Sequence, residues 1–148
     1  MHLIRPFSAA LVLGLMMACA SNAQTPMPMT KMLGAQLMGT SEVPPVTSKG
    51  TGMLEASVNT QTMVMNYTVT YEGLTGAATA GHFHGPAAAG KNAGVALPFS
   101  GGLASPIKGQ ATLTAAQMTQ VMGGNWYVNL HTAANPNGEI RGQVMVKP

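Results

Sequence analysis

The chain has 148 residues, seven Lys or Arg, four acidic residues and a formal net charge of +3. This length suits one domain with one core, and so few charges exclude a nucleic-acid-binding surface, which needs a dense basic stripe. All four acidic residues are glutamates and Cys19 is the one cysteine, which excludes aspartate-based catalytic dyads, disulfides within the domain and thiolate metal ligands downstream of Cys19.

The first 23 residues have the features of a signal peptide. A short basic start precedes an apolar run over residues 7–17 that is too short to span a bilayer, and small residues ending at Ala23 form a cleavage site. We therefore expect residues 1–23 to be removed and the protein to be periplasmic or secreted. The alternative is lipoprotein processing at Cys19, which follows a lipobox-like segment and would anchor the protein to an envelope membrane.

Residues 24–31 contain two prolines and no period that could bury a face, so they predict a flexible linker, with a domain over 32–148. From there on, residues of alternating polarity predict short strands. They lie at 33–38, 51–58, 62–71, 78–84, 95–99, 107–113, 126–131 and 140–146.

One short helix is predicted between the strands at 107–113 and 126–131. Thr114 followed three residues later by Gln117 is a capping box, Leu113 and Met118 are placed as a hydrophobic staple, and Gly123 ends the helix. About eight short strands and one short helix predict an all-β fold, an antiparallel Greek-key-like β-sandwich.

The C-terminal strand pair is predicted to be a hairpin around an Asn-Pro-Asn-Gly loop. Trp126, Val128 and Leu130 form an apolar row that faces a core, which places His131 on the opposite, polar row. In the stretch 78–84, His82 and His84 likewise share one face of a strand.

Three histidines could therefore converge on one ion. Residues two apart on a strand aim at the same spot, and if the two strands are neighbours, His82, His84 and His131 form the three-imidazole arrangement that binds Zn²⁺ or Cu²⁺. The competing interpretation is structural, because the same imidazoles could simply hydrogen-bond loop carbonyls.

Two nearby residues are candidates to support such a site. Glu139 and Arg141 share a face of the return strand and are interpreted as a clasp for the hairpin loop, with Glu139 also a candidate fourth ligand or hydrogen-bond acceptor for a ligand. Asn129 and Tyr127, beside His131, are further candidates to hydrogen-bond the ligands.

Four ordered motifs together resemble the CHRD domain, the module repeated in chordin and found singly in many exported bacterial proteins. They are Gly39-Thr40-Ser41-Glu42-Val43-Pro44-Pro45, Ala80-Gly81-His82-Phe83-His84-Gly85-Pro86-Ala87, Tyr127-Val128-Asn129-Leu130-His131-Thr132 and Pro136-Asn137-Gly138-Glu139-Ile140-Arg141-Gly142-Gln143. The resemblance implies a β-sandwich-like fold outside the cytoplasm and no established catalytic activity.

The expected function is that of a non-enzymatic binding or interaction module of the bacterial envelope, with copper or zinc at the three histidines and an unidentified protein or extracellular-matrix partner. One alternative is a metalloenzyme with a copper site like that of superoxide dismutase, although the chain lacks the aspartate and further histidines of a two-metal site. The other is an adhesion or matrix domain without metal.

Overall fold

The computed structural model describes residues 30–148. The predicted signal peptide, Cys19 and most of the predicted linker lie outside these residues. The elements are β1 (Thr30–Met38), η1 (Gly39–Ser41), β2 (Thr51–Asn59), β3 (Val64–Glu72), β4 (Ala78–His84), β5 (Val95–Pro98), β6 (Ile107–Thr112), α1 (Ala115–Met122), β7 (Trp126–Thr132) and β8 (Ile140–Val146). β1 begins at Thr30, so the last two residues of the predicted linker belong to the sheet. Within residues 30–148, no helix is both long and apolar enough to cross a membrane.

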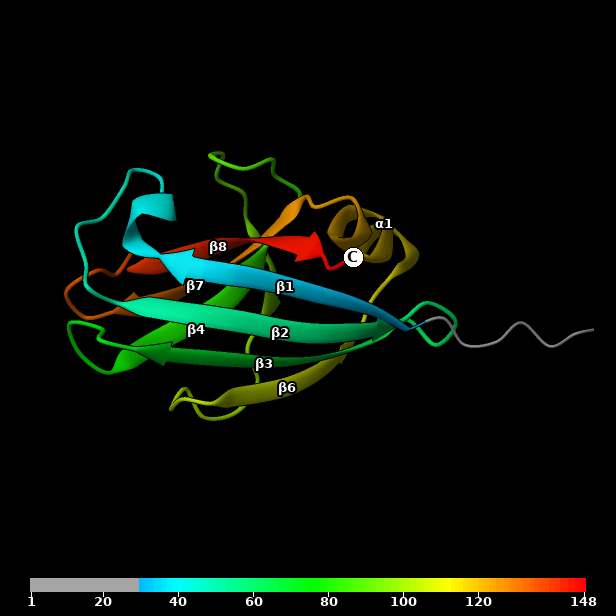
Figure 1. The fold of residues 1–148 in the computed structure, drawn as a ribbon, viewed down its shortest axis with the longest axis horizontal. Helices are drawn as coiled ribbons and strands as arrows, with labels where there is room; N and C mark the ends of the chain where they lie inside the picture. Colours follow the sequence, from blue (N-terminus) through cyan, green and yellow to red (C-terminus); the bar gives the residue numbers. More distant parts are fainter. Residues whose placement is uncertain (1–29) are drawn as a thin grey trace, which may run out of the picture.

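All eight strands belong to a single antiparallel sheet, in the order β5-β4-β7-β8-β1-β2-β3-β6. The predicted all-β antiparallel fold, with eight short strands and one short helix, is confirmed, whereas a sandwich of two separate sheets is not. The reason is β8, which pairs with β7 on one side and with β1 on the other and so joins the two halves into one sheet. The sheet curls strongly, so that β4 and β7 cross behind β1, β2 and β3 (Figure 1).

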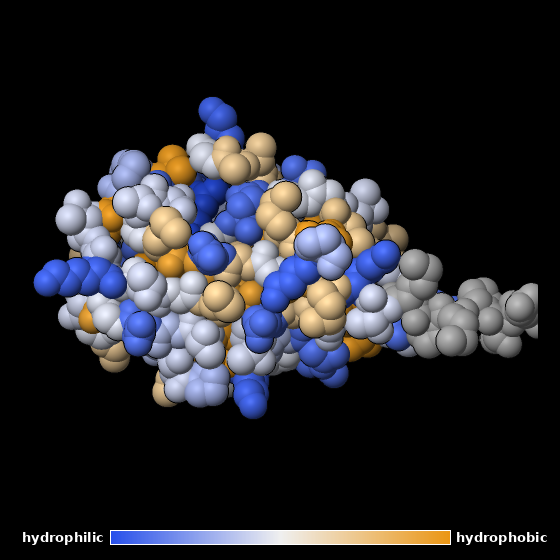
Figure 2. Space-filling view, in the orientation of Figure 1, coloured by the Kyte–Doolittle hydropathy of each residue, from blue (hydrophilic) through white to orange (hydrophobic). Residues whose placement is uncertain are grey.

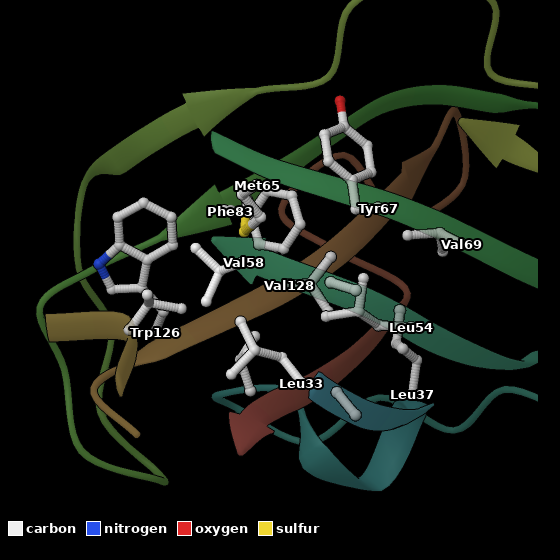
Figure 3. Packing of buried hydrophobic residues seen from close by; sticks show 14 of the residues in the cluster. Leu33, Leu37, Leu54, Val58, Met65, Tyr67, Val69, Phe83, Trp126 and Val128 are labelled. Atoms are coloured by element: carbon white, nitrogen blue, oxygen red, sulfur yellow. The ribbon is translucent and has the colours of Figure 1, made fainter. Parts of the chain in front are cut away.

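The core lies inside this curl. Tyr67 of β3 and Phe83 of β4 come from strands near opposite ends of the sheet, yet their rings meet edge to face with centroids 5.1 Å apart. Figure 3 shows side chains from both halves of the sheet projecting into the same space, among them Leu33, Val58 and Trp126. Burial of this shared apolar cluster holds the two halves together.

The inward rows are the ones that the alternation predicts. Every second residue of β1 from Leu33 to Leu37, and of β2 from Leu54 to Val58, is buried, and the three apolar residues of the predicted hairpin strand are fully buried. The predicted hairpin is confirmed as β7 paired with β8. At its turn Gly138 takes a φ of 126°, a conformation that favours glycine.

Helix α1 has the predicted capping box. The Thr114 side chain accepts a hydrogen bond from the backbone N–H of Gln117, and the Gln117 side chain accepts one from the backbone N–H of Thr114. Met118 and Val121 are buried, so the helix covers one end of the core. The helix ends at Met122, with the predicted Gly123 as its C-cap.

The outer face of β4, β7 and β8 is covered as well. Tyr127, Asn129 and Arg141 belong to the polar rows of their strands but are only 2 to 3% exposed. The loop after β4 lies over them, because the Arg141 guanidinium donates hydrogen bonds to Asn92 Oδ1 (2.8 Å) and to the Lys91 carbonyl (2.6 Å). A buried polar layer therefore lies outside the sheet, on the face opposite the apolar core.

Candidate metal centre

The three predicted histidines lie together on this outer face. His82 and His84 are on β4 and His131 is on β7, and the two strands are paired neighbours. Phe83, between the two β4 histidines, points into the core, so both imidazoles point outward. The predicted convergence of the three residues is confirmed.

The ligand atoms of this cluster are close enough to share an ion. One ring nitrogen from each of His82, His84 and His131 lies within 4.8 Å of the other two. His82 Nδ1 and His131 Nε2 are 3.2 Å apart, near the separation of about 3.4 Å that two nitrogens have around a tetrahedral ion with bonds of about 2.1 Å.

Backbone carbonyls fix two of the rings. His84 Nδ1 lies 3.0 Å from the Ala93 carbonyl oxygen, and His131 Nδ1 lies 3.0 Å from the Pro136 carbonyl oxygen. A carbonyl only accepts, so each Nδ1 must carry the proton and, in a neutral ring, each Nε2 must carry the lone pair. Both Nε2 atoms therefore carry a lone pair that can bind an ion, and an Nδ1–H held by a carbonyl is the arrangement by which proteins orient metal-binding histidines.

Burial favours the neutral form of two of the three imidazoles. Burial lowers the pKa of His82, and the neighbouring His131 and His84 lower it further. Burial also lowers the pKa of His84, which is 9% exposed. Neutral imidazole is the form that binds a metal ion, so these two rings need not lose a positive charge when an ion binds at neutral pH.

An aromatic stack holds His84 in place. Its ring lies parallel to that of Tyr127, with an interplanar angle of 2° and centroids 4.7 Å apart, and the Arg141 guanidinium carbon lies 3.4 Å from the centre of the Tyr127 ring. Tyr127, predicted to hydrogen-bond a ligand, therefore supports the candidate ligand His84 by packing against its ring. Arg141 binds the loop after β4 rather than the hairpin loop, so only one half of the predicted clasp is formed.

Glu139 forms the other half of that clasp and lies apart from the histidines. Its buried carboxylate accepts hydrogen bonds from Ser48, Thr75, Thr132 and Asn135, and within residues 30–148 it makes no hydrogen bond to any of the three histidines. All four partners lie in loops or at the end of β7. The structure thus gives Glu139 the role of joining the hairpin loop to the loops after β1 and β3.

Glu42 is a residue that sequence reasoning did not assign to the site. It follows η1, is 6% exposed, and belongs with Asn129 and Arg141 to the polar layer. Burial raises its pKa to about 7, although the charge of Arg141 and the side chain of Asn129 oppose this shift. One feature of the sequence could have indicated a role for Glu42. It is the one charged residue in an otherwise uncharged Gly-Thr-Ser-Glu-Val-Pro-Pro segment.

The fold and the cluster together define an all-β domain with a three-histidine centre on the outer face of a curled sheet. The family model of the CHRD domain matches residues 33–144, and the chain belongs to this family. Comparison with curated proteins and with solved structures gives no match. The family suggests an interaction module.

Proposed function

We propose that this CHRD domain is an exported, non-enzymatic module of the bacterial envelope that binds one divalent transition-metal ion, Cu²⁺ or Zn²⁺, through His82, His84 and His131. Imidazole nitrogens suit both ions, and the general affinity order favours copper. The ion would be held between two neighbouring strands that are fixed by the core on their other face.

One observation carries this proposal. His84 Nε2 is one of two buried side-chain atoms within residues 30–148 that have no hydrogen-bond partner in the protein. Because the Ala93 carbonyl fixes the Nδ1 proton, the unpartnered atom is a lone pair, on a ring that contributes a nitrogen to the three-histidine cluster. A buried acceptor without a donor costs stability, and a bound cation removes that cost.

The surface supports an interaction module rather than a nucleic-acid-binding one. Figure 2 shows hydrophilic and hydrophobic residues interspersed over the face formed by β1, β2 and β3. The charges are too few for phosphate recognition. The partner would be a protein or an extracellular-matrix component.

The test is metal uptake by the protein produced from the full sequence and purified after export. Elemental analysis and calorimetric titration with Cu²⁺ and Zn²⁺ should give one ion per chain. A double variant, His82→Ala with His84→Ala, should lose uptake while keeping the far-ultraviolet circular dichroism of a β protein.

An exposed carboxylate outside the cluster, Glu55, provides the matched control, because it remains in the mature protein. The Glu55→Ala variant should bind metal like the wild type. No heat and no retained metal in the wild type would refute the metal site and favour an adhesion domain without an ion. Superoxide turnover by the copper-loaded protein would refute the non-enzymatic assignment.

Export is tested by the mass of the mature protein. Cleavage after Ala23 leaves Gln24 at the N-terminus, whereas lipoprotein processing leaves Cys19 carrying a diacylglyceryl group. Either mass in the envelope or medium fraction supports export. A full-length chain that stays in the cytoplasm refutes it.

A further inference from the structure

Asn129 lies beside the histidine cluster with its side chain buried. It is 3% exposed, and its Oδ1 lies 3.1 Å from His131 Nε2. Asn129 is also the residue of β7 that lies directly opposite His82 in the pairing of β4 with β7. The Asn129 amide is therefore next to two of the three imidazoles.

Glu42 determines which end of this amide faces the histidines. Its Oε1 is the second buried side-chain atom without a hydrogen-bond partner within residues 30–148. A Cβ added at Gly138 would collide with both Glu42 Oε1 and Asn129 Nδ2, so these two atoms flank the same glycine. Asn129 Nδ2 therefore lies on the side of Glu42 and Oδ1 on the side of His131, and Nδ2 can donate to a carboxyl oxygen of Glu42 whether or not that carboxyl is protonated.

This orientation places two acceptors against each other. His131 donates its Nδ1 proton to the Pro136 carbonyl, so in the neutral ring Nε2 presents a lone pair. Asn129 Oδ1, 3.1 Å away, also presents lone pairs. Two acceptors at hydrogen-bond distance repel unless a donor or a cation lies beside them. The Nδ1–H of His82, 3.2 Å from His131 Nε2, can act as that donor in the metal-free protein, and a metal ion bound by both acceptor atoms would take its place in the loaded protein.

We infer that Asn129 Oδ1, positioned by Glu42, is a fourth ligand of the ion bound by His82, His84 and His131. This inference rests on the proposed function. Three imidazole nitrogens and one amide oxygen complete a tetrahedral set, and the hard oxygen favours a divalent ion over Cu⁺, which prefers thioether and thiolate sulfur. The site therefore holds copper as Cu²⁺ and holds Cu⁺ more weakly.

The substitution that tests the ligand is Asn129→Leu, which keeps the approximate volume and removes the oxygen. Cu²⁺ affinity should fall about 10- to 100-fold and the electron paramagnetic resonance spectrum should change. Cu⁺ affinity, measured by competition with a Cu⁺ chelator, should change less than about 3-fold, since the oxygen adds little to the binding of a soft ion. Asn129→Asp, which keeps an oxygen, should retain Cu²⁺ binding.

A measurement on the wild type covers the case in which Asn129→Leu does not fold. With ¹³C in the side-chain carbonyl of every asparagine, electron–nuclear double resonance of the Cu²⁺ protein should show a strong coupling to one carbonyl carbon. Absence of this coupling, or unchanged Cu²⁺ affinity and spectrum in a folded Asn129→Leu variant, would refute the inference.

Glu42 is a positioning residue, and its test is rescue. Glu42→Leu should weaken Cu²⁺ binding, while Glu42→Gln, whose carbonyl can still accept from Asn129 Nδ2, should restore it. Wild-type affinity in Glu42→Leu would refute the positioning role. If the wild type binds no metal, the proposed function itself fails. If metal binding depends on the histidines but is unchanged in Asn129→Leu, only this inference fails.

Discussion

The guanidinium carbon of Arg141 lies 3.4 Å from the centre of the Tyr127 ring, and both side chains are almost fully buried on the outer face of the sheet. Arg141 also donates to Asn92 and to the Lys91 carbonyl, and the Asn92 amide donates in turn to the Val43 carbonyl. One planar cation thus joins β8 to the two loops that cover the histidine face.

Replacing Arg141 with lysine should lower the free energy of unfolding by about 2 kcal/mol, because an ammonium keeps the charge but cannot stack on Tyr127 and donate in two directions at once. Urea unfolding measures this loss, and hydrogen exchange should accelerate in residues 87–94. The control is Lys147→Ala, which breaks a surface ion pair with Glu55 and should cost less than about 1 kcal/mol. Equal stability of the two variants would contradict the role assigned to Arg141.

Glu139→Gln should be the most damaging exchange of a single acid. Burial opposes ionisation of Glu139, but hydrogen bonds from Thr132, Thr75 and Ser48 lower its pKa to about 2. A glutamine cannot accept from all these donors, so the free energy of unfolding should fall by about 3 kcal/mol.

The same carboxylate predicts an acid-sensitive stability. The pKa is lower in the folded than in the unfolded chain, so its stabilisation is fully present above pH 4.5 and is lost as the pH falls toward 2. Urea titrations between pH 2 and 5 should show this slope in the wild type and in an exposed-acid control, Glu55→Gln, but not in Glu139→Gln. A shared slope in all three proteins would contradict the prediction.

Glu42 should make the free energy of unfolding fall as the pH rises, the opposite of the effect of Glu139, and in a higher pH range. Its pKa is raised to about 7, so the folded chain holds a proton that the unfolded chain releases near pH 4.5. Stability should therefore fall as the pH rises from 4.5 through 7, by up to about 3 kcal/mol. Glu42→Gln should abolish this decline and be more stable than the wild type at pH 8. Parallel stability curves for the two proteins would show that Glu42 is not protonated in the fold.

Gly142→Ala tests the junction between the two halves of the sheet. A Cβ at this position of β8 would collide with the backbone carbonyl oxygen of Gln36 on β1, and a backbone atom cannot move aside without breaking the pairing. We expect a loss of about 3 kcal/mol or more in the free energy of unfolding. Gly94→Ala is the control, because a Cβ there meets nothing within 4 Å, and its effect should stay within about 1 kcal/mol.

The local elements were predictable because each depends on a short stretch of sequence. The period of two in β1, β2 and β7 assigns the core rows, and the spacing of Thr114 and Gln117 assigns the start of α1. The position of the histidines on one face followed from the same period. Their convergence needed one further condition, the pairing of β4 with β7, which the sequence left open and the structure supplies.

The sheet arrangement and the polar layer were less predictable because they depend on contacts between distant segments. No local pattern states that β8 pairs with both β7 and β1, so a two-sheet sandwich was an equally good reading of the same strands. Burial of Glu42 comes from loops that fold over the strands, and hydrogen bonds such as that from Asn92 to Val43, 49 residues apart, leave no periodic signal. Glu139 was correctly interpreted as a clasp for its loop.

The position of β8 has a consequence for how the molecule is assembled. This strand follows the other seven in the sequence but lies between β7 and β1, where it completes both pairings. Until Ile140–Val146 have paired, β7 and β1 each have an unsatisfied edge that can capture a strand from another chain. The domain therefore stays vulnerable to aggregation until β8 is in place, and a premature stop before Ile140 removes the middle of the sheet rather than its margin.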